Sequence, residues 1–118
     1  NLIVNALQAA VDSPVIRLEA AQNSDGTVSI RIRDNGPGIE AELRERIFEP
    51  FFTTRSGGTG LGLAVVRATV AAHGGDIAVE SAAGTGTTFS LRLPPAPLAG
   101  ALASGAAGAG QNQQGVQA

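Results

Sequence analysis

Two asparagines, Asn1 and Asn5, stand in an opening segment (NLIVNALQAA) whose apolar residues recur at helical spacing. A helix places residues four apart on one face, so the two carboxamides lie side by side, one turn apart. Their oxygens could hold a hard cation such as Mg²⁺, which needs few protein ligands when it arrives with nucleotide phosphates. The alternative for each asparagine is an ordinary solvated surface position, and the pair alone leaves that alternative open.

A carboxylate followed by a glycine-rich turn is the second candidate site. Asp34 ends an alternating apolar segment and precedes residues 35–39 (NGPGI). The carboxylate could accept a hydrogen bond from an exocyclic amine such as that of adenine, while Gly36 and Gly38 allow a flat ring to approach the backbone. An ordinary turn after a strand is the alternative for this segment.

Glycines also precede the longest helical pattern, at residues 57–62 (GGTGLG). The first turn of a helix has unpaired N–H groups and the positive end of the helix dipole, which suit an anion such as phosphate. A flexible linker is the alternative, although leucines alternating with glycines at a helix start favour phosphate binding. A dinucleotide-binding fingerprint is excluded because the glycines lack its spacing and do not follow a strand.

Apolar periodicity and turn residues predict the elements that position these candidates. The opening helix runs over residues 1–11 and stops before Pro14, which cannot continue it. We expect two antiparallel hairpins and two further helices. They comprise strands at 15–20 and 27–34 around a turn at 22–26, a short helix at 40–47, a long helix at 60–73, and two strands around a turn at 82–86.

The order of the main elements, α, β, β, α, β, β, predicts an α+β fold. We expect a two-layer α/β sandwich with helices on one face of a mixed, mostly antiparallel sheet. Helical spacing and strand alternation also predict which apolar side chains face the core. They are Leu2, Ile3, Ala6, Leu7 and Ala10 in the first helix, Leu61, Ala64, Val65, Ala68 and Ala72 in the long helix, and Ile16, Leu18, Val28, Ile30, Ile32, Ile77, Val79, Phe89, Leu91 and Leu93 in the strands.

The 118 residues suffice for one domain. Residues 94–118 contain no charged residue and are mostly Ala, Gly, Pro and Gln, so we expect a disordered tail after a domain at 1–93. The sequence begins inside a helical pattern. We therefore expect a piece of a longer protein, truncated at its N-terminus.

Composition excludes several function classes. A net charge of −2 without a basic cluster argues against nucleic acid as a partner. There is no cysteine for a disulfide or a thiolate metal site, and no apolar run as long as a membrane span. We expect this domain to be cytoplasmic, whether or not the full-length protein is anchored in a membrane. All eight basic residues are arginine, which excludes the Walker A loop and the protein-kinase fold in their usual forms because both use a lysine.

Taken in order, these segments resemble the ATP-binding catalytic domain of two-component sensor histidine kinases. That domain belongs to the GHKL superfamily, shared with DNA gyrase, Hsp-type chaperones and MutL-like repair proteins, and has a Bergerat-type fold. The similarity covers residues 1–93, and FEPFFTTR followed by GTGLGLAVV is most similar to the nitrogen-regulation, flagellar and dicarboxylate-sensing branch. The matching segments are the N box at 1–9, the G1 box at 34–39, the F box at 47–55, the G2 box at 58–63 and the G3 segment at 84–89.

This resemblance implies a role for each matching residue. Asn5 would hold Mg²⁺ and Asp34 the adenine amine, with Thr87 supporting adenine through its hydroxyl group. Asn5 and Arg55 would be the catalytic residues, Arg55 standing where many relatives have lysine and reaching the phosphates from a mobile lid at residues 51–55. The full ATP-binding set would be Asn1, Asn5, Gln8, Asp34, Gly36, Gly38, Ile39, Phe52, Thr53, Thr54, Arg55, Gly58, Thr59, Gly60, Leu61, Gly62, Leu63 and Thr87.

Asn1 helps to choose an activity within the superfamily. In the ATP-hydrolysing branch that position resembles a glutamate that activates water, and a carboxamide cannot act as this general base. We therefore expect the domain to keep ATP intact and to donate its γ-phosphoryl group to a histidine on a separate, upstream helical domain. His73, in AAHGG, lacks the sequence context of a phosphoacceptor and is not expected to be one.

The implied partners are the protein's own dimerisation and phosphoacceptor domain and the receiver domain of a response regulator. The full-length protein would be a homodimer and no nucleic acid would bind. Three alternatives stay open: a GHKL-type ATPase, an anti-sigma-type serine kinase, and a degenerate interaction module without catalysis.

Overall fold

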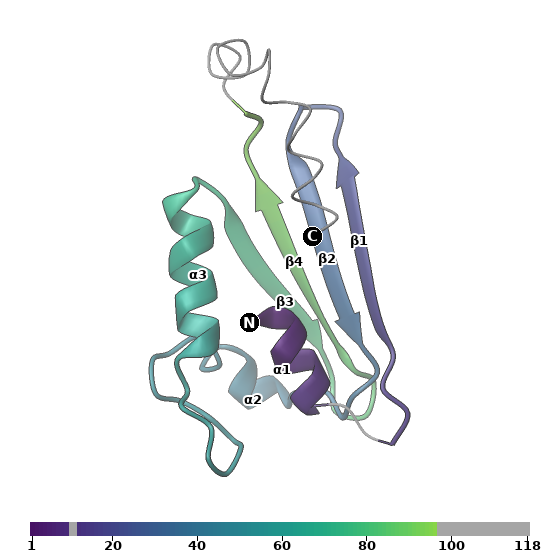
Figure 1. Cartoon of the computed structure of the whole chain (residues 1–118), viewed down its shortest axis with the longest axis vertical. Helices are drawn as coiled ribbons and strands as arrows, with labels where there is room; N and C mark the ends of the chain where they lie inside the picture. The colour runs from purple at the N-terminus through teal and green to yellow at the C-terminus, as the bar shows by residue number, and fades with distance from the viewer. Residues whose placement is uncertain (10–11, 97–118) are drawn as a thin grey trace.

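A single antiparallel sheet carries the helices on one of its faces (Figure 1). The structure is a computed structural model that describes residues 1–9 and 12–96, so the predicted helix end at Val11 and most of the predicted tail lie outside it. The sheet has the order β1-β2-β4-β3. The elements are α1 (Leu2–Ala9), β1 (Ile16–Gln22), β2 (Val28–Asp34), α2 (Ala41–Arg44), α3 (Gly62–Ala72), β3 (Asp76–Ser81) and β4 (Thr87–Leu93).

Every neighbouring strand pair in the described sheet is antiparallel, which confirms the expected α+β class and makes the sheet more uniform than the mixed one predicted. Phe89 is the centre of the core. It is 2% exposed, lies opposite Ile32 on β2 and Val79 on β3, and packs nearly perpendicular to the Phe48 ring at a centroid distance of 6.2 Å. The other residues of the cluster around Phe89 are Leu2, Ile16, Ile39, Ile47, Phe52, Leu63, Val66, Ile77 and Leu91, and Ala6 and Val70 are buried as well.

The opening helix buries a narrower face than its sequence predicts. Leu2 and Ala6 are buried, whereas Ile3 and Leu7 are 48% and 55% exposed, so the prediction that the latter two face the core is wrong. The buried pair is one turn apart, and the helix lies against β2, β1 and α3. Ala10 lies outside the described residues.

The long helix is rotated relative to its predicted orientation. Leu63, Val66 and Val70 face the core, while Leu61 and Val65 are exposed. The remaining members of the predicted stripe, Ala64, Ala68 and Ala72, contribute no buried residue either. The segment GLAVVRATVAA is apolar almost all round, so helical periodicity fits two faces equally well and the wrong one was predicted.

Strand β1 lies at one edge of the sheet and is exposed along most of its length. Leu18 is 59% exposed, so its predicted place in the core is wrong. The helix layer covers this strand only near Ile16, the one β1 residue that packs against the core cluster. The exposure of Leu18 follows from that limited cover.

Candidate nucleotide-binding site

One face of α1 contacts two of the predicted binding segments through its asparagines. The Arg55 guanidinium donates a hydrogen bond from Nη1 to Asn5 Oδ1 over 3.1 Å. Asn1 lies next to Gly62, the first residue of α3. If Gly62 carried a Cβ atom, that atom would be 3.7 Å from Asn1 Oδ1. The lid segment at 51–55 and the glycine-rich helix start therefore both meet the N box.

The last residue of the same helix contacts the G1 turn at residues 34–39. A Cβ atom on Gly36 would lie 2.9 Å from the carbonyl oxygen of Ala9, a distance that only glycine avoids. Asn1 directly precedes α1 and accepts the Asn5 backbone N–H, and the Ala9 carbonyl lies one turn beyond Asn5, so three separate segments meet successive turns of this helix. The lid contact at Asn5 thus lies between the contact with α3 at Asn1 and the contact with the G1 turn at Ala9.

Asp34 and Thr87 form the buried end of the sheet beside that turn. They lie directly opposite each other on β2 and β4 and are only 4% and 6% exposed. Asp34 Oδ1 accepts a hydrogen bond from the backbone N–H of Gly36 over 2.8 Å. Its second oxygen accepts no hydrogen bond from residues 1–9 or 12–96 and so remains available to a ligand.

Ser81 is a residue that the sequence did not single out, although it links the G1 turn to the G3 segment. Its Oγ accepts a hydrogen bond from the Ile39 backbone N–H over 2.7 Å and donates one to the Gly86 carbonyl over 2.8 Å. The same oxygen lies 3.0 Å from Thr87 Oγ1. Gly38 must be glycine for two reasons. Its φ is 78°, and a side chain on it would overlap the backbone carbonyl of Ala82. A serine at a strand end before a glycine turn was the available signal.

The two phenylalanines at the start of the lid segment separate. Phe51 is 76% exposed, adopts a φ of 70°, and donates its backbone N–H to the Gly60 carbonyl over 2.8 Å. Phe52 packs against the core, and the Arg46 guanidinium lies 4.4 Å from the centre of its ring. Phe52 therefore fixes the base of the lid, and Gly60 is required because any side chain there would overlap the Phe51 backbone.

Short-range bonds shape the rest of the lid and the glycine-rich segment. Thr53 Oγ1 accepts the Arg55 backbone N–H over 3.1 Å, and the Gly58 N–H is donated to the Arg55 carbonyl over the same distance. Thr59 Oγ1 accepts the Leu61 N–H over 3.2 Å. These bonds make compact turns and leave the Arg55 side chain to reach Asn5.

Three other predicted site residues lie apart from these contacts. Gln8 and Thr54 are exposed, and Leu63 packs against the core. His73 is exposed at the end of α3, with Nδ1 2.8 Å from the carbonyl oxygen of Thr69. Its position caps a helix end, as expected for a structural histidine.

The donor atoms suit Mg²⁺ only when phosphates accompany it. Among the described residues no group of three or more His, Cys, Asp or Glu side chains could hold a metal, whereas Asn5 offers one neutral oxygen on the α1 face. Mg²⁺ commonly takes one or two protein oxygens together with nucleotide phosphates. No helix in the described part of the chain is long and apolar enough to cross a membrane.

The sequence is similar to those of several sensor histidine kinases. It is 48% identical to the signal transduction histidine-protein kinase AtoS of Escherichia coli over 97 residues, which are 82% of this chain and 16% of that protein. It is 49% identical to the sensor histidine kinase ZraS of the same organism over 94 residues, 80% of this chain and 20% of that protein. It is 42% identical to the C4-dicarboxylate transport sensor protein DctB of Rhizobium meliloti over 97 residues, 81% and 16% of the two chains. The chain thus spans about a sixth to a fifth of the length of these relatives.

Solved structures of histidine kinases share the fold. The mycobacterial sensor histidine kinase MprB superposes with a TM-score of 0.73 at 33% identity, over 82% of this chain and 67% of that one. Full-length ShkA in complex with AMPPNP gives a TM-score of 0.71 at 35% identity, over 79% of this chain and 19% of that one.

Residues 1–97 match the family described as histidine kinase-, DNA gyrase B-, and HSP90-like ATPase. This match covers the sheet, the helices and every predicted binding segment. The chain belongs to this ATPase family and is a histidine kinase catalytic domain of the kind found in two-component sensor kinases.

Proposed function

We propose that residues 1–93 bind ATP with Mg²⁺ and donate the γ-phosphoryl group to a histidine on a separate helical domain, in signalling to a response regulator. The observation that supports this function most is the face of α1 that meets three segments in turn. Through Asn1, Asn5 and Ala9 it contacts the start of α3, the lid and the G1 turn. Positions suited to phosphate, metal and adenine therefore surround a single helix.

The buried end of the sheet is suited to adenine. Asp34 is fixed by the Gly36 N–H through one oxygen, so the other oxygen can accept the exocyclic amine. Thr87 adds a hydroxyl group beside it, held near Ser81. A buried carboxylate that accepts a ligand hydrogen bond contributes more binding free energy than an exposed one, because water does not compete for it.

The opposite end of the α1 face is suited to the phosphates. Arg55 bonds to Asn5 Oδ1 in the present structure. Phosphate oxygens are stronger acceptors for a guanidinium than a carboxamide is, so we infer that they replace Asn5 as the partner of Arg55. Asn5 Oδ1 is then available to Mg²⁺, which when bound neutralises phosphate charge, and the N-terminus of α3 faces the same phosphates.

Donation rather than hydrolysis is favoured by the residue one turn before Asn5. Asn1 presents a carboxamide, which cannot take a proton from water as a general base does. We propose that bound ATP is kept intact until a phosphoacceptor domain docks. We do not expect His73 to be that acceptor, because AAHGG lacks the sequence context of a phosphoacceptor and His73 lies at the opposite end of α3 from the glycine-rich segment.

Binding of Mg·ATP by site variants tests this assignment. Asn5→Ala is expected to weaken ATP binding by about ten- to hundredfold with Mg²⁺ and hardly at all in EDTA, because its role requires the metal. Asp34→Ala is expected to weaken binding in both conditions. Gln22→Ala removes an exposed amide at the end of β1 and serves as the matched control. Unchanged affinity in both site variants, with folding verified by circular dichroism, contradicts the assignment.

Turnover separates the proposed kinase from its alternatives. The chain alone is expected to release phosphate slowly and not to label itself, and to phosphorylate histidine when a helical phosphoacceptor domain is added. Rapid phosphate release supports an ATPase, and transfer to serine supports an anti-sigma-type kinase. Absence of Mg·ATP binding supports the interaction module.

A further inference from the structure

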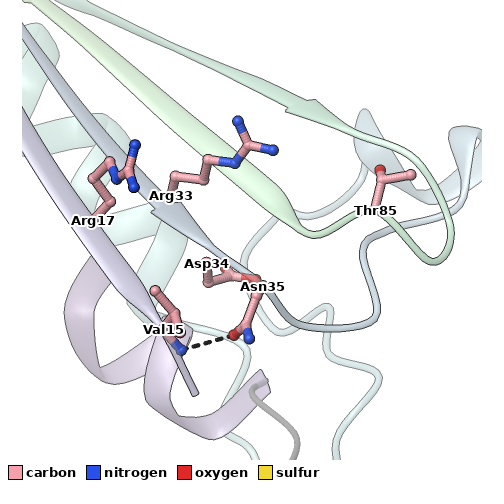
Figure 2. Close-up of a pocket in the computed structure, with 6 residues that line it drawn as sticks. All are labelled: Val15, Arg17, Arg33, Asp34, Asn35 and Thr85. Carbon is pink, nitrogen blue, oxygen red and sulfur yellow. Dashed lines mark hydrogen bonds between the residues drawn. The ribbon is translucent and has the colours of Figure 1, made fainter. Parts of the chain in front are cut away.

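A cavity of about 380 Å³ lies on the face of the sheet that carries no helix. Its most prominent side chains are Arg17 on β1 and Arg33 on β2 (Figure 2). Ile32 and Asp34, the neighbours of Arg33, are buried on the helix side, so alternation along β2 puts Arg33 on the open side. In Figure 2 both arginine side chains extend to the same side of the sheet. The cavity is lined by Val15, Arg17, Arg33, Asp34, Asn35 and Thr85.

The two arginines face each other, and neither forms an ion pair with a described residue. They are directly opposite in the β1–β2 register, a position in which like charges destabilise a sheet. In the described part of the chain, the ion pairs within 4.0 Å join Arg46 to Glu49 and Arg92 to Asp25, and neither includes Arg17 or Arg33. The sheet therefore holds two like charges opposite each other without a close ion pair to either one.

Other charged residues on this face are placed differently. Arg31 lies opposite Glu19, so it has an acidic residue across from it. Arg33 has Thr88 as its neighbour on β4, and Glu80 comes only one strand further on. Glu19 is also two residues from Arg17 on the same face, so Arg17 and Arg33 are distinguished by having no acidic residue directly across from either one.

We propose that Arg17 and Arg33 form a docking site for an acidic segment of a protein partner. Guanidinium groups bind carboxylates through paired hydrogen bonds, and two of them side by side fit two neighbouring carboxylates. A single small carboxylate would gain little at such an exposed pair. A protein segment presents several carboxylates and also excludes water, which strengthens each contact.

Nucleic acid fits this face less well. Phosphate-backbone binding requires more cationic groups, and single-stranded nucleic acid also requires aromatic side chains on which bases stack. Phe89 is the only aromatic residue in the strands of the described sheet, and it is buried in the core on the other side. The partner surface is therefore better matched by a protein rich in Asp and Glu.

Fluorescence anisotropy with a labelled peptide of alternating Glu and Ser tests the docking site. The double variant Arg17→Gln/Arg33→Gln is expected to bind the peptide about tenfold more weakly than the wild type. Arg31→Gln removes one charge from the same face at a position that has an acidic neighbour, and is expected to change affinity by less than about twofold. Equal binding by the double variant, or an equal loss in Arg31→Gln, overturns the proposal.

Further measurements identify the site and the class of partner. Saturating Mg·ATP is expected to leave peptide binding unchanged, because the two guanidinium groups extend to the open face of the sheet even though Asp34 also borders the cavity (Figure 2). Competition between the two ligands overturns the proposal. Tighter binding of a single-stranded oligonucleotide also overturns it, in favour of nucleic acid. Each single arginine variant is expected to unfold at the same or a higher temperature, since repulsion is relieved, and a clear fall contradicts the repulsive pairing.

Discussion

The hydrogen bond between Gly36 and Asp34 makes the predicted base specificity open to a sharp test. In the wild type the Gly36 backbone N–H donates a hydrogen bond to Asp34 Oδ1 over 2.8 Å. In Asp34→Asn the amide oxygen can accept the same bond, so the side chain is expected to orient its oxygen toward Gly36. The amide nitrogen then takes the place of the second carboxylate oxygen. A donor consequently faces the adenine amine, which is itself a donor, and the ligand hydrogen bond is lost.

The magnitude follows from burial. Asp34 is 4% exposed, so a lost hydrogen bond to its charged group corresponds to about 1.5–3 kcal/mol, or about ten- to hundredfold weaker ATP binding. Inosine triphosphate carries a carbonyl where ATP has the amine. That carbonyl oxygen is repelled by the carboxylate of Asp34, but it can accept a hydrogen bond from the amide nitrogen in Asp34→Asn. The affinity for inosine triphosphate is therefore expected to rise in the variant.

Isothermal titration of both nucleotides against the wild type and the variant gives the ratio of the two dissociation constants. Asp34→Asn is expected to shift this ratio toward inosine triphosphate by more than tenfold. Asp76→Asn makes the same chemical change at an exposed position on β3 and is expected to leave the ratio unchanged. A uniform loss for both nucleotides, with the ratio preserved, refutes the contact between Asp34 and the base.

Three further predictions concern stability. Phe89→Ala is expected to lower the free energy of unfolding by about 3–5 kcal/mol in urea titration, because it empties the centre of the core. Phe51→Ala, at a side chain that is 76% exposed, is expected to change it by less than about 0.5 kcal/mol, and equal effects would contradict the described core. Ser81→Ala removes the acceptor of a G1 backbone N–H and is expected to cost about 1–3 kcal/mol, measured in the same way, and to weaken ATP binding; a variant as stable as the wild type argues against that link. Hydrogen bonds from the Thr27 hydroxyl and backbone N–H hold the pKa of Asp25 below its ordinary value. Because the folded-state pKa is the lower one, this stabilisation is complete above the ordinary aspartate pKa and is lost as the pH falls through the folded-state value. Asp25→Asn is therefore expected to be less stable than the wild type in urea titration at neutral pH and equally stable in acid. A difference in stability that does not depend on pH contradicts this prediction.

Local rules predicted the elements that depend on neighbouring residues. Helical periodicity put Asn1 and Asn5 on one face, and strand alternation put Ile32 and Phe89 in the core, as the structure confirms. Asp34 continues the alternation of Val28, Ile30 and Ile32, and it is buried on the same face of β2 as Ile32. Its pairing with Thr87 depends on the β2–β4 register, which alternation alone does not specify.

Tertiary contacts decided what could not be predicted. The rotation of α3 depends on which of two apolar faces meets the sheet, and helical spacing does not distinguish Leu63 from Leu61. Ser81 joins two segments far apart in the sequence, so no local pattern reveals its partners. The binding roles of the site residues stay predictions, for the experiments above to decide.

Strand β2 makes the protein unusually sensitive to changes in chain length. Arg33 and Asp34 are consecutive, and one is exposed on the open face while the other is buried beside Thr87. Inserting or deleting a single residue within β2 would exchange their sides, moving a guanidinium into the core and a carboxylate into water. The turn around Gly57, where a Cβ atom meets nothing within 4 Å, carries no such constraint. Among homologous chains, length variation should therefore be found in the turn around Gly57 and be absent from this strand.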